Sequence, residues 1–191
     1  MRKTFALPTF LLAAVALLAG PLTVSAQAEE ESYSFIGLKK CSMCHKKEAT
    51  GNQLAVWEKT SHAKAYETLA GPEAMKVAKE RGIANPQEAP ECLECHVTAF
   101  PVMADLANQK ITMEEGVSCE SCHGAGSAYY KKSTMTDIAA GTIEPASVGL
   151  VIPSEETCTK CHNEKSPSFK GFDFEEAAAK IAHPIPEGAE S

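Results

Sequence analysis

Aromatic residues are scarce in this chain of 191 residues: Phe, Trp and Tyr make up 6% of it, and it has one Trp. The chain therefore offers few of the large side chains that dominate an ordinary core. Basic side chains are outnumbered by acidic ones, 18 against 25, so the net charge is −7. Nucleic acid is a poor partner for such a surface. Beyond the N-terminus, no apolar run reaches the roughly 20 residues needed to cross a bilayer, so no membrane span is expected.

The N-terminus carries the pattern of an export signal. Arg2 and Lys3 precede a mostly apolar stretch at residues 6–18, and small residues at Ala26 and Ala28 fit a cleavage site. An uncleaved anchor is the alternative, although Pro8 interrupts the apolar stretch. We predict a signal peptide at residues 1–28, a single domain at residues 29–191, and a periplasmic location. Cleavage leaves 16 basic against 25 acidic residues, or about −9.

All eight cysteines fall in Cys-x-x-Cys-His motifs. Two thiols three positions apart can both reach the vinyl groups on one edge of a porphyrin, and the adjacent imidazole is then held beneath the iron. We therefore predict four covalently attached haem c groups. The motifs are motif 1 (Cys41, Cys44, His45), motif 2 (Cys92, Cys95, His96), motif 3 (Cys119, Cys122, His123) and motif 4 (Cys158, Cys161, His162).

Zinc sites and disulfides are the structural alternatives. Paired cysteines can close on one zinc ion, but a zinc ribbon does not explain a histidine after every second cysteine. Disulfides in an exported protein would leave the four histidines equally unexplained.

The rest of the chain predicts a mainly α fold, in which short helices and loops wrap the four haems with little or no β-structure. We expect helices at residues 52–69 and 72–81. Ser154 is expected to cap a short helix carrying motif 4, and a last helix should begin at Asp173 and end before Pro184. The motifs repeat at unequal intervals, which favours an irregular array over a solenoid.

Only two histidines lie outside the motifs, His62 and His183. In a chain with four irons that need sixth ligands, both are candidates for the distal position opposite a motif histidine.

Three segments resemble the tetrahaem cytochrome c-554 family: KKCSMCH followed by TSHAKAYETL, then GVSCESCHGAG, and finally CTKCHNEKSP. Founding members of that family accept electrons from hydroxylamine oxidoreductase. The resemblance implies a mostly helical periplasmic electron carrier with haems in closely packed pairs. By position it implies that His62 lies opposite His123 and that His183 lies opposite His45. It also implies a five-coordinate second haem, and the chain has no obvious histidine for the iron above His96.

One segment departs from the family pattern. The resemblance implies that the fourth haem takes its distal histidine from just after motif 3, but residues 124–132 contain none. Met135 is a candidate replacement above His162, and it would raise the potential of that haem. The alternatives are a Met that only fills a gap beside the porphyrin, ligation by Tyr129, Tyr130 or Lys131, and an open iron.

These features favour electron transfer over catalysis, since no acid, base or nucleophile is needed. We expect a periplasmic carrier, monomeric, that exchanges electrons with redox proteins of a respiratory chain, including partners associated with the membrane. Two alternatives stay open. One is reduction of nitric oxide or a related small nitrogen ligand at a five-coordinate haem. The other is a haem filament, in which the chain would be oligomeric.

Overall fold

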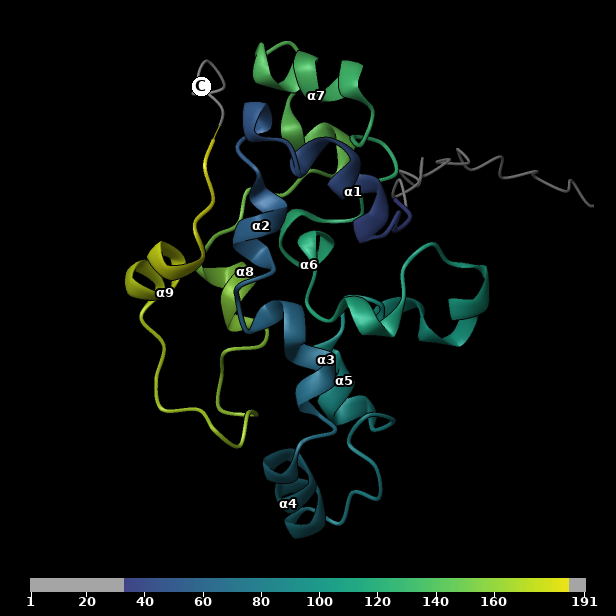
Figure 1. The fold of residues 1–191 in the computed structure, drawn as a ribbon, viewed down its shortest axis with the longest axis vertical. Helices are drawn as coiled ribbons and strands as arrows, with labels where there is room; N and C mark the ends of the chain where they lie inside the picture. Colours follow the sequence, from purple (N-terminus) through teal and green to yellow (C-terminus); the bar gives the residue numbers. More distant parts are fainter. Residues whose placement is uncertain (1–32, 186–191) are drawn as a thin grey trace, which may run out of the picture. The chain divides into compact units, whose positions relative to one another are not determined.

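The structure is a computed structural model that describes residues 33–185, and within these residues it is helical without strands (Figure 1). A mainly α fold is therefore confirmed. The α-helices are α1 (Leu38–His45), α2 (Gln53–Trp57), α3 (Ala65–Thr68), α4 (Pro72–Glu80), α5 (Pro90–His96), α6 (Cys119–His123), α7 (Lys132–Ala139), α8 (Glu155–Thr159) and α9 (Phe174–Ile181). The 3-10 helices are η1 (Glu48–Thr50), η2 (His62–Lys64), η3 (Phe100–Asn108), η4 (Met113–Glu115) and η5 (Pro145–Val148). The expected signal peptide lies outside the described residues.

The helix expected at residues 52–69 is wrong as a single element, because the chain forms α2, η2 and α3 there. The break comes from a contact with a distant segment. The indole nitrogen of Trp57 donates to the carbonyl of Val117 at 2.8 Å, and the backbone N–H of Val117 donates to the carbonyl of His62 at 3.1 Å. Because the N–H of Val117 satisfies the carbonyl of His62, that carbonyl needs no partner within a continuous helix.

The other expected helices are confirmed with small shifts at their ends. Pro72 is the first residue of α4, a position whose N–H has no partner within the helix, so the missing N–H of proline costs nothing there. Ser154 caps α8 in a capping box with Thr157, and Asp173 caps α9 by accepting from the N–H of Glu176 at 2.9 Å. Helix α9 ends at Ile181, so His183 lies just beyond it.

The buried apolar core is small. It centres on Leu69, Leu93 and Val97, with partly buried side chains such as Phe100 and Met113 packed against them. These residues belong to α3, α5, η3 and η4, so the core lies around motif 2. The sparse core agrees with the low aromatic content of the sequence.

Motif 1 is joined to motif 3 by a buried carboxylate. Glu120, 3% exposed, accepts from the backbone N–H groups of Ile36 (3.0 Å), Gly37 (2.8 Å) and Gly126 (2.7 Å). Glu115 accepts from the N–H of Leu38, the first residue of α1, at 2.8 Å. The two acids replace a local helix cap and fix the start of α1 against α6.

Candidate haem-binding site

Each motif lies on a short helical turn that ends at or near its histidine. Motif 1 ends α1, motif 2 ends α5, and motif 3 is α6 itself. Motif 4 starts on α8 and continues as a turn in which the N–H of His162 donates to the carbonyl of Cys158 at 3.0 Å. A helical turn places residues three and four apart on one side, which brings each cysteine pair and its histidine to a common face.

Three of the four motif histidines use Nδ1 in a hydrogen bond. His96 bonds the carbonyl of Ala65 at 2.7 Å, His123 the carbonyl of Val151 at 3.2 Å, and His45 the side-chain oxygen of Gln53 at 3.1 Å. A carbonyl oxygen only accepts, so Nδ1 is the protonated nitrogen and Nε2 keeps its lone pair. This is the arrangement in which a histidine binds a metal through Nε2.

The two histidines outside the motifs lie beside motif histidines. The ring of His62, carried by η2, has its centroid 5.9 Å from that of His162, at an interplanar angle of 76°. The ring of His183 lies 5.9 Å from that of His123, at 44°. The ring of His162 also stacks on Phe172, with centroids 4.9 Å apart.

These neighbours differ from the pairing that the family resemblance implies, in which His62 would face His123 and His183 would face His45. At motif 4, for which the sequence offers no distal histidine after motif 3, the ring beside His162 is that of His62. Met135, one candidate for that position, is half-buried on α7. Tyr129, a weaker candidate, donates its hydroxyl to the carbonyl of Gly124 at 2.7 Å, and burial raises the pKa of its phenol.

The spacing of both ring pairs fits a metal between them. Two metal–nitrogen bonds of about 2 Å and two ring radii add up to roughly 6 Å between centroids. Burial lowers the pKa of His62, His123 and His183, so these imidazoles are neutral at neutral pH. Neutral imidazoles, cysteine pairs on the same turns and protonated Nδ1 atoms together form a donor set that fits haem c.

The motifs also lie close to one another. The thiols of Cys41 and Cys119 are within hydrogen-bonding reach, which raises the pKa of Cys41 and lowers that of Cys119. Burial, followed by the nearby thiol of Cys95, raises the pKa of Cys161 to about 12. Burial and the thiol of Cys158 raise the pKa of Cys122. Motif 1 thus neighbours motif 3, motif 3 neighbours motif 4, and motif 4 neighbours motif 2.

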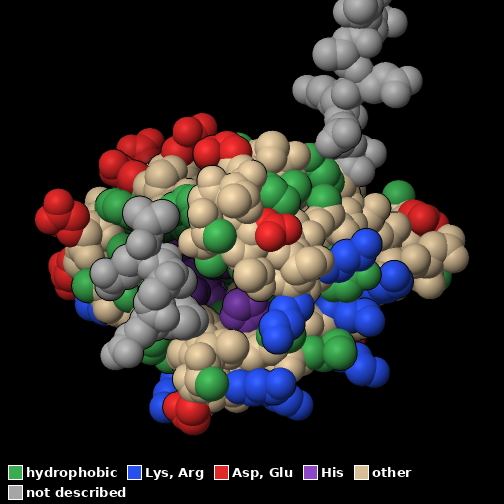
Figure 2. Space-filling model, turned by 90° about the horizontal axis from the view of Figure 1, so that it is seen from above, with side chains coloured by type: hydrophobic (Ala, Val, Ile, Leu, Met, Phe, Trp, Pro, Cys, Tyr) green, Lys and Arg blue, Asp and Glu red, His purple; other side chains and the backbone are tan. Residues whose placement is uncertain are grey.

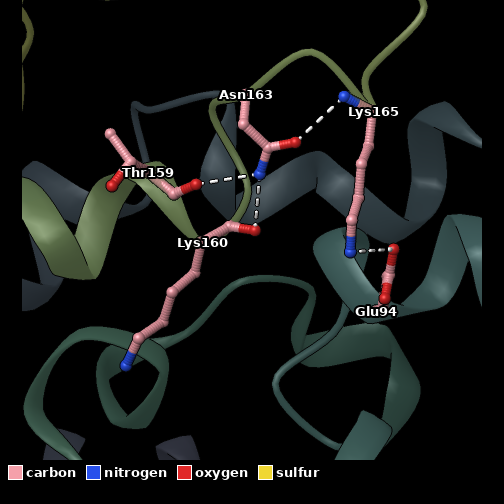
Figure 3. Close-up of polar contacts among 5 residues, drawn as sticks. All are labelled: Glu94, Thr159, Lys160, Asn163 and Lys165. Carbon is pink, nitrogen blue, oxygen red and sulfur yellow. Dashed lines mark hydrogen bonds and ion pairs between the residues drawn. The ribbon is translucent and has the colours of Figure 1, made fainter.

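A loop reinforces the contact between motifs 4 and 2 (Figure 3). Asn163, which follows His162, donates to the carbonyls of Thr159 at 2.8 Å and Lys160 at 2.9 Å. Its side-chain oxygen accepts from the N–H of Lys165 at 3.0 Å, and the Lys165 ammonium lies 3.8 Å from the carboxylate of Glu94 within motif 2. The Asn163 bonds order the loop that follows motif 4, and the exposed ion pair to Glu94 adds little energy.

The structural alternatives find no support here. All eight cysteines are unpaired, and residues 33–185 contain no group of three or more His, Cys, Asp or Glu side chains that could hold a metal ion on their own.

Sequence reasoning found every motif residue but missed the acceptors of Nδ1. Two of them are backbone carbonyls, those of Ala65 and Val151, and such groups carry no sequence signal. Gln53, the third, is a side chain that could have been noticed only from the placement of α2 beside α1.

Comparison with known proteins identifies relatives of this chain. Residues 40–124 match the family described as cytochrome c554 and c-prime. A curated relative, cytochrome c-554 of Nitrosomonas europaea, is 34% identical over 160 residues, which cover 77% of this chain and 66% of the relative. The chain thus spans just under two thirds of that relative's length. No solved structure matches the chain at a significant level. With the motif geometry, these matches establish that the chain belongs to the cytochrome c-554 family of haem c proteins.

Proposed function

We propose that this protein is an exported tetrahaem electron carrier, which receives electrons from one redox protein of a respiratory chain and delivers them to another. The observation that carries the proposal is the succession of neighbouring motifs in the order 1, 3, 4, 2. Haems attached at these positions would form one continuous row. Haem c, when attached, supplies the iron that takes up and releases one electron at a time.

The protein's own contribution is to hold the row together and to set ligand strength. Glu115 and Glu120 fix motif 1 to motif 3, and Asn163 orders the loop that follows motif 4. The Nδ1 bonds of His45, His96 and His123 orient the imidazoles and raise their basicity. No proton needs to move for an electron to pass, so no general acid or base is required.

His62 and His183 are the proposed distal ligands. Ring proximity favours His62 opposite His162, whereas His183 lies beside His123 and also interacts electrostatically with His45, so the pairing with His45 that the resemblance implies is kept for His183. Under this proposal His62 serves motif 4, and Met135 has no part there.

Lysines around motif 1 favour an acidic redox partner. Lys39, Lys40, Lys46 and Lys47 are exposed, and no acidic side chain forms an ion pair with them within residues 33–185. Figure 2 shows basic side chains gathered on one side of a face and acidic ones on the other, with histidine visible between them. Charge of this kind steers encounter with a partner of opposite sign at the end of the haem row. Within the described residues, no helix has the length and apolar character of a membrane span.

Haem count and export can be tested together. The full chain should be produced in a bacterium with cytochrome c maturation, and its periplasmic fraction analysed by intact-mass spectrometry. We expect a chain without residues 1–28 that carries four haem masses. A mass with fewer haems, or holoprotein retained in the cytoplasm, would contradict the proposal.

A further inference from the structure

We propose that the protein binds a proton when the haems of motifs 1 and 3 are reduced, and that the carboxylate of Glu115 is the proton-binding group. The inference rests on the proposed tetrahaem function and adds proton uptake to it. In the balanced step, a ferric iron gains one electron from the donor protein and becomes ferrous, while Glu115 gains one proton from solvent and becomes a neutral carboxylic acid. The proton responds to the added charge and is not needed for the electron to pass.

Glu115 lies where motifs 1 and 3 meet. One of its oxygens accepts from the N–H of Leu38, the first residue of α1, at 2.8 Å, and the same oxygen accepts from the hydroxyl of Ser118 at 3.5 Å. Ser118 directly precedes motif 3. Besides the hydrogen bond between the thiols of Cys41 and Cys119 and the burial of both, the charge of Glu115 acts on each thiol. A change of charge at Glu115 is therefore felt at the attachment points of both haems.

Glu115 differs from its neighbour Glu120 in its access to solvent. Glu120 is 3% exposed and accepts from the backbone N–H groups of Ile36, Gly37 and Gly126. Bonds of this kind favour the charged form of a carboxylate. Glu115 is half-buried, so its carboxylate is partly desolvated and still able to exchange a proton with solvent. Of the two acids, Glu115 is the one suited to change its protonation.

The surroundings of Glu115 disfavour a negative charge. Burial raises the pKa of its carboxyl above the usual range of glutamate, and the negative charge of Glu120 adds to this, while hydrogen bonds to Glu115 oppose it. Within residues 33–185, no basic side chain forms an ion pair with either acid.

Other ionisable groups on the elements around η4 cannot replace Glu115 in this role. Attachment of haem converts the nearby thiols to thioethers, which do not titrate, and the lysines and Glu67 are exposed to solvent. These groups are Lys39, Lys40 and Cys41 on α1, His62 and Lys64 on η2, Tyr66 and Glu67 on α3, and Cys119 on α6.

The direction of the coupling follows from charge. Reduction adds a negative charge beside Glu115, which raises the pKa of this carboxyl further, so the reduced protein binds the proton more tightly than the oxidised protein does. The potentials of the two haems should be constant below the Glu115 pKa of the oxidised protein. They should fall as the pH rises above it, and become constant again above the higher pKa of the reduced protein. For one electron, the fall is at most about 59 mV for each tenfold change in proton concentration.

The first test counts protons on the full wild-type holoprotein. The protein is reduced at an electrode in unbuffered solution that contains a pH indicator, and the experiment is repeated over a range of starting pH. We expect net uptake that rises towards about one proton per chain at pH values above the usual titration range of glutamate, and that declines at higher pH. No uptake at any pH at which the protein is folded would overturn the inference. Four haem masses with no uptake would leave the proposed carrier intact.

The second test assigns the proton to Glu115. Glu115→Gln keeps an oxygen that can accept from Leu38 but cannot titrate, so this pH dependence of the potentials should be lost. The carboxylic acid C=O band expected in reduced-minus-oxidised infrared spectra should be lost with it. Glu114→Gln is the matched control, because it makes the same charge change at an exposed neighbour on η4, and it should keep both signals.

Unchanged pH dependence in Glu115→Gln would place the proton on another group, such as a haem propionate, and would overturn the inference. Isotopic labelling of glutamate side chains gives the same decision in the wild-type protein, even if the variant does not fold. The infrared band should shift on labelling, and a band that stays in place would exclude Glu115.

Discussion

At the scale of single residues, Glu120 shows how a polar side chain can replace apolar packing. Its carboxylate is buried and accepts hydrogen bonds from three backbone N–H groups in two separate segments. Removing one partner of a buried hydrogen bond leaves the other desolvated and unpaired, at a cost of about 1–3 kcal/mol for each group.

Glu120→Ala should therefore lower the free energy of unfolding of the holoprotein by roughly 3 kcal/mol or more. The measurement is the guanidinium midpoint followed by haem absorbance. Glu91→Ala on α5 is the matched control, because Glu91 is exposed and, like Glu120, is adjacent to the first cysteine of a haem motif. Equal midpoints for the two variants would show that the Glu120 network contributes no stability.

At the scale of elements, the segment around Gly116 positions η2 and thereby His62. Gly116 has φ +59°, and a Cβ atom there would lie 2.9 Å from the carbonyl oxygen of His62 and 3.3 Å from the N–H nitrogen of Ala65. Both neighbours are backbone atoms, so a side chain at position 116 must push η2 away.

Gly116→Ala should weaken the ligation of motif 4 by His62, and the low-spin EPR signal of that haem should broaden or convert partly to high spin. Gly82→Ala is the control, since Gly82 has φ +71° with no atom near its Cβ position. Both variants place a side chain at positive φ, but only the first side chain meets a neighbouring segment, so only the first should change the haem signal. An unaltered EPR spectrum for Gly116→Ala would argue against His62 as a ligand.

The same elements show what could be predicted from sequence. Helix α4 begins at Pro72, and α8 and α9 follow the N-caps Ser154 and Asp173, because these starts depend on residues within one turn. The break of residues 52–69 into three elements depends on Trp57 and Val117, which are 60 positions apart. The ring neighbours of His62 and His183 are likewise long-range contacts, so composition and spacing identified the histidines but not their partners.

At the scale of the whole molecule, the small core makes folding depend on the haem groups. Few apolar side chains are fully buried within residues 33–185, and they cluster around motif 2. Burial of apolar surface is the main favourable contribution to folding, and each porphyrin presents a large apolar surface of its own.

We therefore expect the chain to be poorly folded when it is made without haem attachment. Far-UV circular dichroism of haem-free protein should show much less helix than the holoprotein, measured at equal concentration. Helical content close to that of the holoprotein would mean that the polypeptide folds without the haems.

The central claim is that the four motifs form one conducting row in the order 1, 3, 4, 2. The most direct measurement is pulse radiolysis with fewer electrons than protein chains, followed by absorbance changes as each electron redistributes among the haems. If the haems form such a row, each electron should redistribute within one chain, at a rate independent of protein concentration and faster than the initial reduction. A rate that rises in proportion to protein concentration would contradict it, because electrons would then pass only between molecules.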